Sequence, residues 1–169
     1  MSTIPRRRYL QLTGITAVGS LTGCAGDGGD SGPVAGEEYP AIDTWLTETE
    51  IGGADETYEG VLVDRRDRDT LTIEVGTEGN GGDFAYAPSA VLVSSGTNID
   101  WEWTGRGNPH NVEAEPEDQI GESDYEFSSG EAVGGSGVQY SLSMDMAGIA
   151  LYHCEPHLGL GMKGGIAVE

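Results

Sequence analysis

Short stretches in which apolar and polar side chains alternate recur from about Tyr39 to the end of the chain, separated by Gly, Asn, Asp and Pro. Alternation with a period of two residues is typical of β-strands that bury one face. It predicts strands at 58–63, 70–75, 84–87, 90–93, 98–103, 112–115, 138–142, 149–154 and 165–168. The polar stretch 64–69 is predicted to be the turn between the first two strands.

The predicted strand 98–103 indicates where the core lies. Trp101 and Trp103 flank the charged Glu102, so both rings should point to one face of a sheet, into the interior. Segment 41–49 is predicted to be either a short helix or an edge segment that lays its apolar residues on the sheet. The chain has no sustained helical periodicity and holds 28 glycines. These features predict a single all-β domain, 39–169, built as an antiparallel sandwich or barrel.

The first 23 residues indicate an export signal rather than part of the fold. Consecutive arginines at 6–8 precede a weakly apolar stretch, which resembles a twin-arginine signal, and the ending 21–24 resembles a lipobox. Cys24 would then be the lipidated first residue of the mature protein. The alternative is an uncleaved anchor, but spanning a bilayer takes about 20 mainly apolar residues, and this run is shorter and interrupted. Residues 24–38, rich in Gly and Asp, are predicted to be a flexible tether.

The charge of the chain limits its partners. Residues 24–169 contain all 29 acidic but only five of the eight basic residues, which gives a net charge of −24. Nucleic acid is excluded as a partner because phosphate binding needs a basic surface. The acidic excess is either a docking face for a basic partner or an adaptation to molar salt, where the Debye length falls to about 3 Å. The even spread of the acidic residues favours the adaptation to salt.

The end of the chain holds a cysteine, a histidine and a methionine at close spacing. Cys154, His157 and Met162 are separated by two and then four residues. A strand that carries Cys154 into the Pro- and Gly-rich loop can bring all three to one point, and thiolate, thioether and imidazole together select copper. His110 supplies the second imidazole that such a site requires. The remaining histidine, His153, neighbours Cys154 on the strand and so should point to the opposite face.

Two motifs in these segments resemble the plastocyanin-like cupredoxins, and most closely the halocyanins, the blue copper proteins of haloarchaea. They are Pro109-His110-Asn111-Val112 and the loop Cys154-Glu155-Pro156-His157-Leu158-Gly159-Leu160-Gly161-Met162, and the likeness covers roughly residues 58–169. It implies a Greek-key β-sandwich with one copper ion per chain under the loops at one end. It differs from plant plastocyanins at His153, because they carry an aromatic residue beside the cysteine.

The resemblance also implies a role for each residue of the site. Three strong ligands, His110 Nδ1, Cys154 Sγ and His157 Nδ1, and a long axial bond from Met162 Sδ would hold the copper. Asn111, beside Pro109, would support the ligand loops through hydrogen bonds. Each ligand has another interpretation: Cys154 could pair with Cys24 in a disulfide, Met162 could fill the core, and the histidines could bind zinc. Lipidation of Cys24 would leave Cys154 unpaired, and metal ligation would account for that thiol.

The function expected from these features is one-electron transfer between membrane-bound redox proteins, a donor and an acceptor, by a monomer that is not an enzyme. The electron should pass through the edge of His157, inside an apolar patch formed by Leu158 and Leu160. Lys163, the only lysine, lies beside the site, where its charge would offset the acidic field. The alternatives are a copper store or chaperone, and a copper enzyme, which would need further histidines for a catalytic metal.

Overall fold

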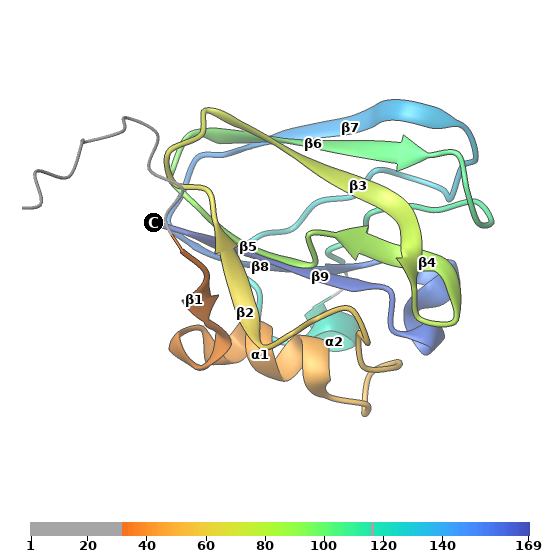
Figure 1. The fold of residues 1–169 in the computed structure, drawn as a ribbon, viewed down its shortest axis with the longest axis horizontal. Coiled ribbons are helices and arrows are strands. Elements are labelled where there is room, and N and C mark those ends of the chain that lie inside the picture. Colours follow the sequence, from red (N-terminus) through yellow and green to blue (C-terminus); the bar gives the residue numbers. More distant parts are fainter. Residues whose placement is uncertain (1–31, 116) are drawn as a thin grey trace, which may run out of the picture.

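The computed structural model of the chain describes residues 32–115 and 117–169. The predicted export signal, Cys24 and most of the predicted tether therefore lie outside the described residues. Two β-sheets pack face to face, and a helix covers the outer side of the lower sheet in Figure 1.

The strands divide into a five-stranded and a four-stranded sheet. The first sheet has the order β1-β2-β5-β9-β8, formed by Val34–Ala35, Val61–Asp64, Ala90–Val93, Lys163–Val168 and Gly148–His153. The second has the order β4-β3-β6-β7, formed by Gly82–Ala87, Thr70–Gly79, Thr97–Thr104 and Ser136–Met144. Eight of the nine predicted strands coincide with these elements. The predicted strand 112–115 makes only isolated bridges, from Glu113 to Ser128 and to His153.

The sheets are mixed rather than purely antiparallel. Strands β2 and β5, β3 and β6, and β5 and β9 pair in parallel, and the other pairs are antiparallel. The predicted turn 64–69 does join β2 to β3, but it carries the chain from one sheet to the other. Parallel neighbours need such crossovers, and a local alternation pattern does not specify which strand pairs with which. The all-β Greek-key sandwich is confirmed, and the prediction of antiparallel pairing throughout is wrong.

The core lies between the two sheets. Trp101 and Trp103 are buried as predicted, on the inner face of β6. They pack with buried aliphatic and aromatic side chains from both sheets, among them Ile73, Leu92, Ile99, Leu151 and Ile166. The two layers thus meet through one continuous apolar cluster, which also contains Cys154 and Met162.

Segment 41–49 forms helix α1 (Pro40–Thr47) rather than an edge segment. Pro40 occupies the first turn, where its fixed φ suits a helix and its missing N–H costs nothing. The apolar face of α1, with Ile42, Trp45 and Leu46, is buried against β9 and β8. Among the described residues no helix is long and apolar enough to cross a membrane.

Four short elements follow no alternation pattern. Helix α2 (Glu117–Ile120) is a single turn, and the six-residue 3-10 helix η2 (Glu155–Leu160) makes about two turns. Both lie within loops. Strand β1 and the 3-10 helix η1 (Gly36–Glu38) lie inside the range 24–38 that composition assigns to the tether. Val34 and Ala35 pair there with Leu62 and Val61 of β2.

Because the core is continuous, shortening a side chain inside it should strongly lower the free energy of unfolding. Ile99→Ala on β6 removes a fully buried side chain and should lower the free energy of unfolding by about 2–5 kcal/mol. Val138→Ala on β7, where the side chain is 52% exposed, should change it by less than about 0.5 kcal/mol. Equilibrium denaturation of both variants checks this, and equal losses would contradict the assigned core.

Candidate metal centre

The predicted site residues lie on two loops at one end of the sandwich. His110 follows β6, whereas Cys154, His157 and Met162 occupy the connection from β8 through η2 to β9. Backbone hydrogen bonds close this connection: the N–H of Cys154 donates to the carbonyl of Met162 at 3.0 Å, and the N–H of His157 donates to that of Cys154 at 3.1 Å. The antiparallel pairing of β8 with β9 therefore brings the ends of the loop together.

The structure brings the thiol and two imidazoles into one buried cluster. Cys154 Sγ lies 3.3 Å from His157 Nδ1 and 3.8 Å from His110 Nδ1. The candidate ligand atoms of the three residues all lie within 4.8 Å of one another. The imidazole rings are tilted by 58° with centroids 4.8 Å apart. All three side chains are buried, and Phe84 packs on His157 with ring centroids 4.5 Å apart.

This spacing fits a single metal ion. Metal–nitrogen and metal–sulfur bonds are about 2.0–2.3 Å long in zinc sites, so one ion can join a nitrogen and a sulfur that lie up to about 4.3 Å apart. Both nitrogen–sulfur pairs of the cluster are within that span. Two imidazoles and a thiolate in this arrangement match the trigonal set of blue-copper sites.

The ring of His110 is held with Nδ1 toward the sulfur. Nε2 lies 3.2 Å from the carbonyl of Arg106, which can only accept, so the ring proton is on Nε2 and Nδ1 keeps a free lone pair. Gly76 and Gly107 make room for the ring, since a Cβ added at either would lie 2.8 Å from Nε2, and both have positive φ. Backbone bonds to Val133 fix the His110 main chain.

Asn111 connects the two ligand loops. Its Oδ1 accepts from the N–H of Glu155 at 2.9 Å, and its Nδ2 donates to the Glu155 carboxylate at 2.7 Å and to the carbonyl of Gly130 at 3.1 Å. The hydroxyl of Tyr86 donates to the Asn111 carbonyl at 2.6 Å. Asn111 therefore joins the loop that carries His110 to the start of the Cys154–Met162 loop. Pro109 is exposed, and it restricts the backbone immediately before His110.

The electrostatics of the cluster favour uncharged groups when no cation is bound. Burial raises the pKa of the Cys154 thiol to about 11, although the backbone N–H groups of Asn111 and His157 act to lower it. Burial also lowers the pKa of His110. The pKa of His157 is lowered by burial and then by the neighbouring His110. A bound cation would reverse this preference at the sulfur, because coordination stabilises the thiolate.

The remaining predicted residues occupy the same loop. Met162 is fully buried, and its N–H donates to the His157 carbonyl at 3.3 Å. Leu160 is 48% exposed, whereas Leu158 is half-buried because residues around Gly52 cover it. His157 itself is only 6% exposed, so it contributes little to the surface over the site.

His153 and Lys163 lie on the other face of the β8–β9 pair, next to each other in register. His153 faces Trp45 with ring centroids 6.2 Å apart, and burial lowers its pKa to about 4, helped by Lys163. This agrees with its predicted direction, away from the sulfur. The prediction for Lys163 is wrong, because the side chain is fully buried and paired with Glu48 instead of lying in the surface field.

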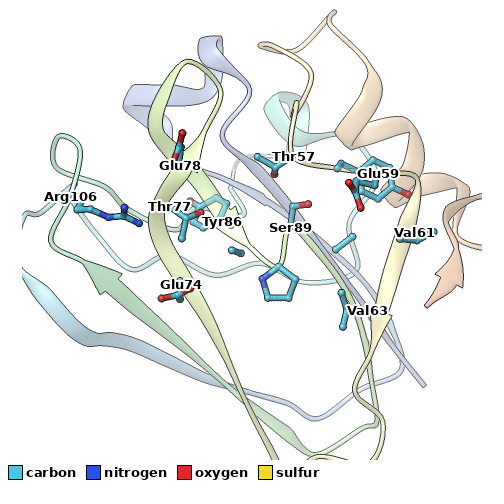
Figure 2. Close-up of a pocket in the computed structure, with 14 residues that line it drawn as sticks. Thr57, Glu59, Val61, Val63, Glu74, Thr77, Glu78, Tyr86, Ser89 and Arg106 are labelled. Atoms are coloured by element: carbon cyan, nitrogen blue, oxygen red, sulfur yellow. The ribbon is translucent and has the colours of Figure 1, made fainter. Parts of the chain in front are cut away.

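Sequence reasoning missed Phe84, the Arg106 carbonyl, Glu155 and the glycines around the His110 ring. Their roles depend on strand pairing, and the only signal in the sequence was the cluster of glycines around Arg106. An open cleft of about 450 Å³ lies nearby, between β2 and the β3–β4 pair (Figure 2). Tyr86 and Arg106 line it, but none of the metal-cluster residues does. The metal centre is therefore a filled, buried cluster separate from this cleft.

Comparison with known proteins identifies the class. Residues 73–169 match the family model for copper binding proteins of the plastocyanin/azurin family. A halocyanin from Natronomonas pharaonis is 38% identical, over all of both chains. A plastocyanin from Scenedesmus fuscus is 34% identical over 59% of this chain and 99% of its own. A solved structure of a Cu(I) amicyanin variant aligns with 59% of this chain and 82% of its own, at 22% identity and a TM-score of 0.44.

The chain belongs to the plastocyanin/azurin family of copper-binding proteins. Its likeness over the full length is to a halocyanin, so it is a halocyanin-like cupredoxin with one copper ion and an electron-transfer role.

The contacts of Asn111 predict an effect on metal affinity. Asn111→Ala removes the bonds between the two ligand loops and should weaken copper binding about 10- to 100-fold, as loss of outer hydrogen bonds does in other metal sites. Competition titration with a copper chelator measures it. Asn98→Ala on β6 is the control, since its amide bonds only Asp100 on the sheet surface. Unchanged affinity in Asn111→Ala would contradict the assigned role.

Proposed function

We propose that this chain is a one-electron shuttle whose single copper is held by His110, Cys154, His157 and Met162, and that it carries electrons between membrane-bound redox proteins. The observation that carries this proposal is the buried convergence of Cys154 Sγ with the Nδ1 atoms of His110 and His157. When bound, copper supplies the couple between Cu(I) and Cu(II). The protein supplies a cage that both states accept.

The rigidity of the cage supports this role. The His110 ring is fixed by Arg106 and by two close glycines, and the His157 loop is fixed by its own backbone bonds and by Asn111. Groups held in this way move little when the charge of the ion changes by one, so little reorganisation accompanies each transfer. The thioether of Met162 would complete the ligand set.

The exchange surface would be the apolar rim above His157. Leu160, at 48% exposure, is the most exposed large apolar side chain of the ligand loop, and Leu158 adjoins it. A contact limited to this rim would be small, which suits redox partners that must separate quickly. The donor and the acceptor are expected to be membrane-bound, and the shuttle itself a monomer.

We further propose a location at the outer face of the cell membrane, on the basis of the segment that precedes β1. An export signal ending before Cys24 and a lipid on that cysteine would anchor the domain, and the Gly- and Asp-rich stretch after it would provide reach. The net charge of −24 from residue 24 onward suits a medium of high salt, where screening limits self-repulsion.

A copper store or chaperone is the second candidate, and a copper enzyme the third. A store would be expected to present exposed ligands for exchange, but Cys154 and Met162 are fully buried. A catalytic copper would need a second histidine cluster, and the one histidine left over, His153, is buried against Trp45. Both features favour the shuttle.

Absorption spectroscopy tests the proposal. The copper protein should have an intense visible absorption band, expected from the family likeness, that bleaches on one-electron reduction and returns on reoxidation. Cys154→Ser should lose the band, because the thiolate is its source, while Ser89→Ala, on the open cleft, should keep it. A colourless wild-type copper protein, or one that turns over a substrate alone, would contradict the shuttle.

Mass spectrometry of the protein purified from its native membrane tests the anchor. The mature chain should begin at Cys24 with a lipid mass on that residue, and Cys24→Ala should release the domain from the membrane. An unmodified chain beginning at Met1 would refute the proposed processing.

A further inference from the structure

The segment from Pro40 to Thr57, termed here the N-terminal brace, packs on the ligand loop from outside the strands of the shared core. It comprises α1 and the loop after it, whereas the family model begins at residue 73. The role inferred for this brace rests on the proposed function, because both concern the same copper centre.

The brace touches the ligand loop directly. The N–H of Gly53 donates to the Leu158 carbonyl at 2.9 Å. A Cβ added at Gly53 would lie 2.9 Å from the N of Gly161 and 3.0 Å from the carbonyl carbon of Leu160. At the neighbouring Gly52, an added Cβ would lie 2.8 Å from the Leu158 side chain. The two backbones therefore pack with no room for even a methyl group between them.

A second link runs through Asn80, in the turn between β3 and β4. Its Oδ1 accepts from the N–H of Glu56, and its Nδ2 donates to the carbonyl of Gly161 at 3.1 Å and to Asp55 Oδ1 at 3.2 Å. Gly161 directly precedes Met162. Through Asn80, the brace therefore constrains the backbone on the N-terminal side of Met162.

The third link is Lys163, which directly follows Met162. Its Nζ donates to the Glu48 carboxylate at 2.6 Å, to the Trp45 carbonyl at 3.1 Å and to the Glu48 carbonyl at 3.2 Å, and it lies 4.2 Å from the centre of the Trp45 ring. The Trp45 indole in turn donates to the Tyr152 carbonyl at 3.2 Å. The only lysine of the chain thus attaches α1 to β9, the strand that follows the metal centre.

We propose that the N-terminal brace is a positioning element of the copper centre, which fixes the position of the Leu158–Met162 backbone and thereby that of Met162, the proposed fourth ligand. The three links hold the residues on both sides of Met162, and the backbone bonds of Met162 to Cys154 and His157 carry that constraint to the other ligands. If the brace served only stability, weakening its contacts would leave the properties of the copper centre unchanged. If it is a positioning element, weakening the same contacts would change those properties.

Two variants test the brace from different sides. Gly53→Ala places a methyl group against the ligand loop, at a position whose φ does not require glycine. Lys163→Met removes the fastening charge but keeps a long apolar side chain, and it leaves Glu48, 20% exposed, able to reach water. Removing one partner of a buried ion pair is costly when the other charge stays buried. The Glu48 carboxylate can instead turn toward water, so the second variant remains informative if the first folds poorly.

Each variant has a matched control. Gly32→Ala adds a methyl group where nothing lies within 4 Å. Arg68→Met removes one positive charge from an exposed side chain just before β3, at the opposite end of that strand from Gly76 and the His110 ring.

The copper-loaded full-length proteins are compared by midpoint reduction potential, by the visible spectrum and by copper loss to a chelator. Gly53→Ala and Lys163→Met should both shift the potential and alter the band, and release copper about tenfold faster, at the lower end of the effect of outer contacts on metal affinity. The controls should match the wild type in all three measurements.

Lower melting temperatures with an unchanged potential, spectrum and release rate would assign the brace to stability alone and overturn the proposal. A shift in Gly53→Ala alone would remove Lys163 from the positioning role, and a shift in Lys163→Met alone would remove the Gly53 contact. If the wild type itself lacked the band and the reversible couple, the proposed function would fail, which is a different result from a normal wild type with normal variants.

Discussion

The metal centre depends on the antiparallel pairing of β8 with β9. This pairing brings the two ends of the connecting loop next to each other. The hydrogen bond from the N–H of Cys154 to the Met162 carbonyl is the last rung of that pairing on the loop side. It places the cysteine and the methionine at the same level and forces the residues between them into the tight turn of η2. His157 then projects back toward the sulfur, and only His110 has to come from elsewhere.

The second constraint is the packing of the two sheets. His110 follows β6 in one sheet and Cys154 follows β8 in the other, so the imidazole and the thiol meet only if the layers hold a fixed separation. The continuous apolar cluster between the sheets provides that separation, because close-packed interiors resist small displacements. Asn111 then ties the two loops with hydrogen bonds at the rim.

The polar groups near the centre are divided between two faces of the β8–β9 pair. One face carries the thiol and the imidazoles, where burial favours neutral groups and a bound cation restores the thiolate. The other face carries His153 and Lys163, which pack against Trp45 of α1. Consecutive residues of a strand point to opposite faces. Cys154 can therefore face the metal site while His153 packs against α1. A single sheet edge thus serves both the metal and the brace.

Local patterns in the sequence were enough to place eight strands, to bury Trp101 and Trp103, and to select the histidines that flank Cys154 in space. They were enough because alternation, turn residues and ligand chemistry are properties of short segments. The parallel pairings, the short loop helices and the location of Lys163 were not accessible in this way. Neither were the carbonyl and the glycines that orient the His110 ring. Each of these depends on which distant segments become neighbours, and that is decided only when the two sheets pack and exclude water from the space between them.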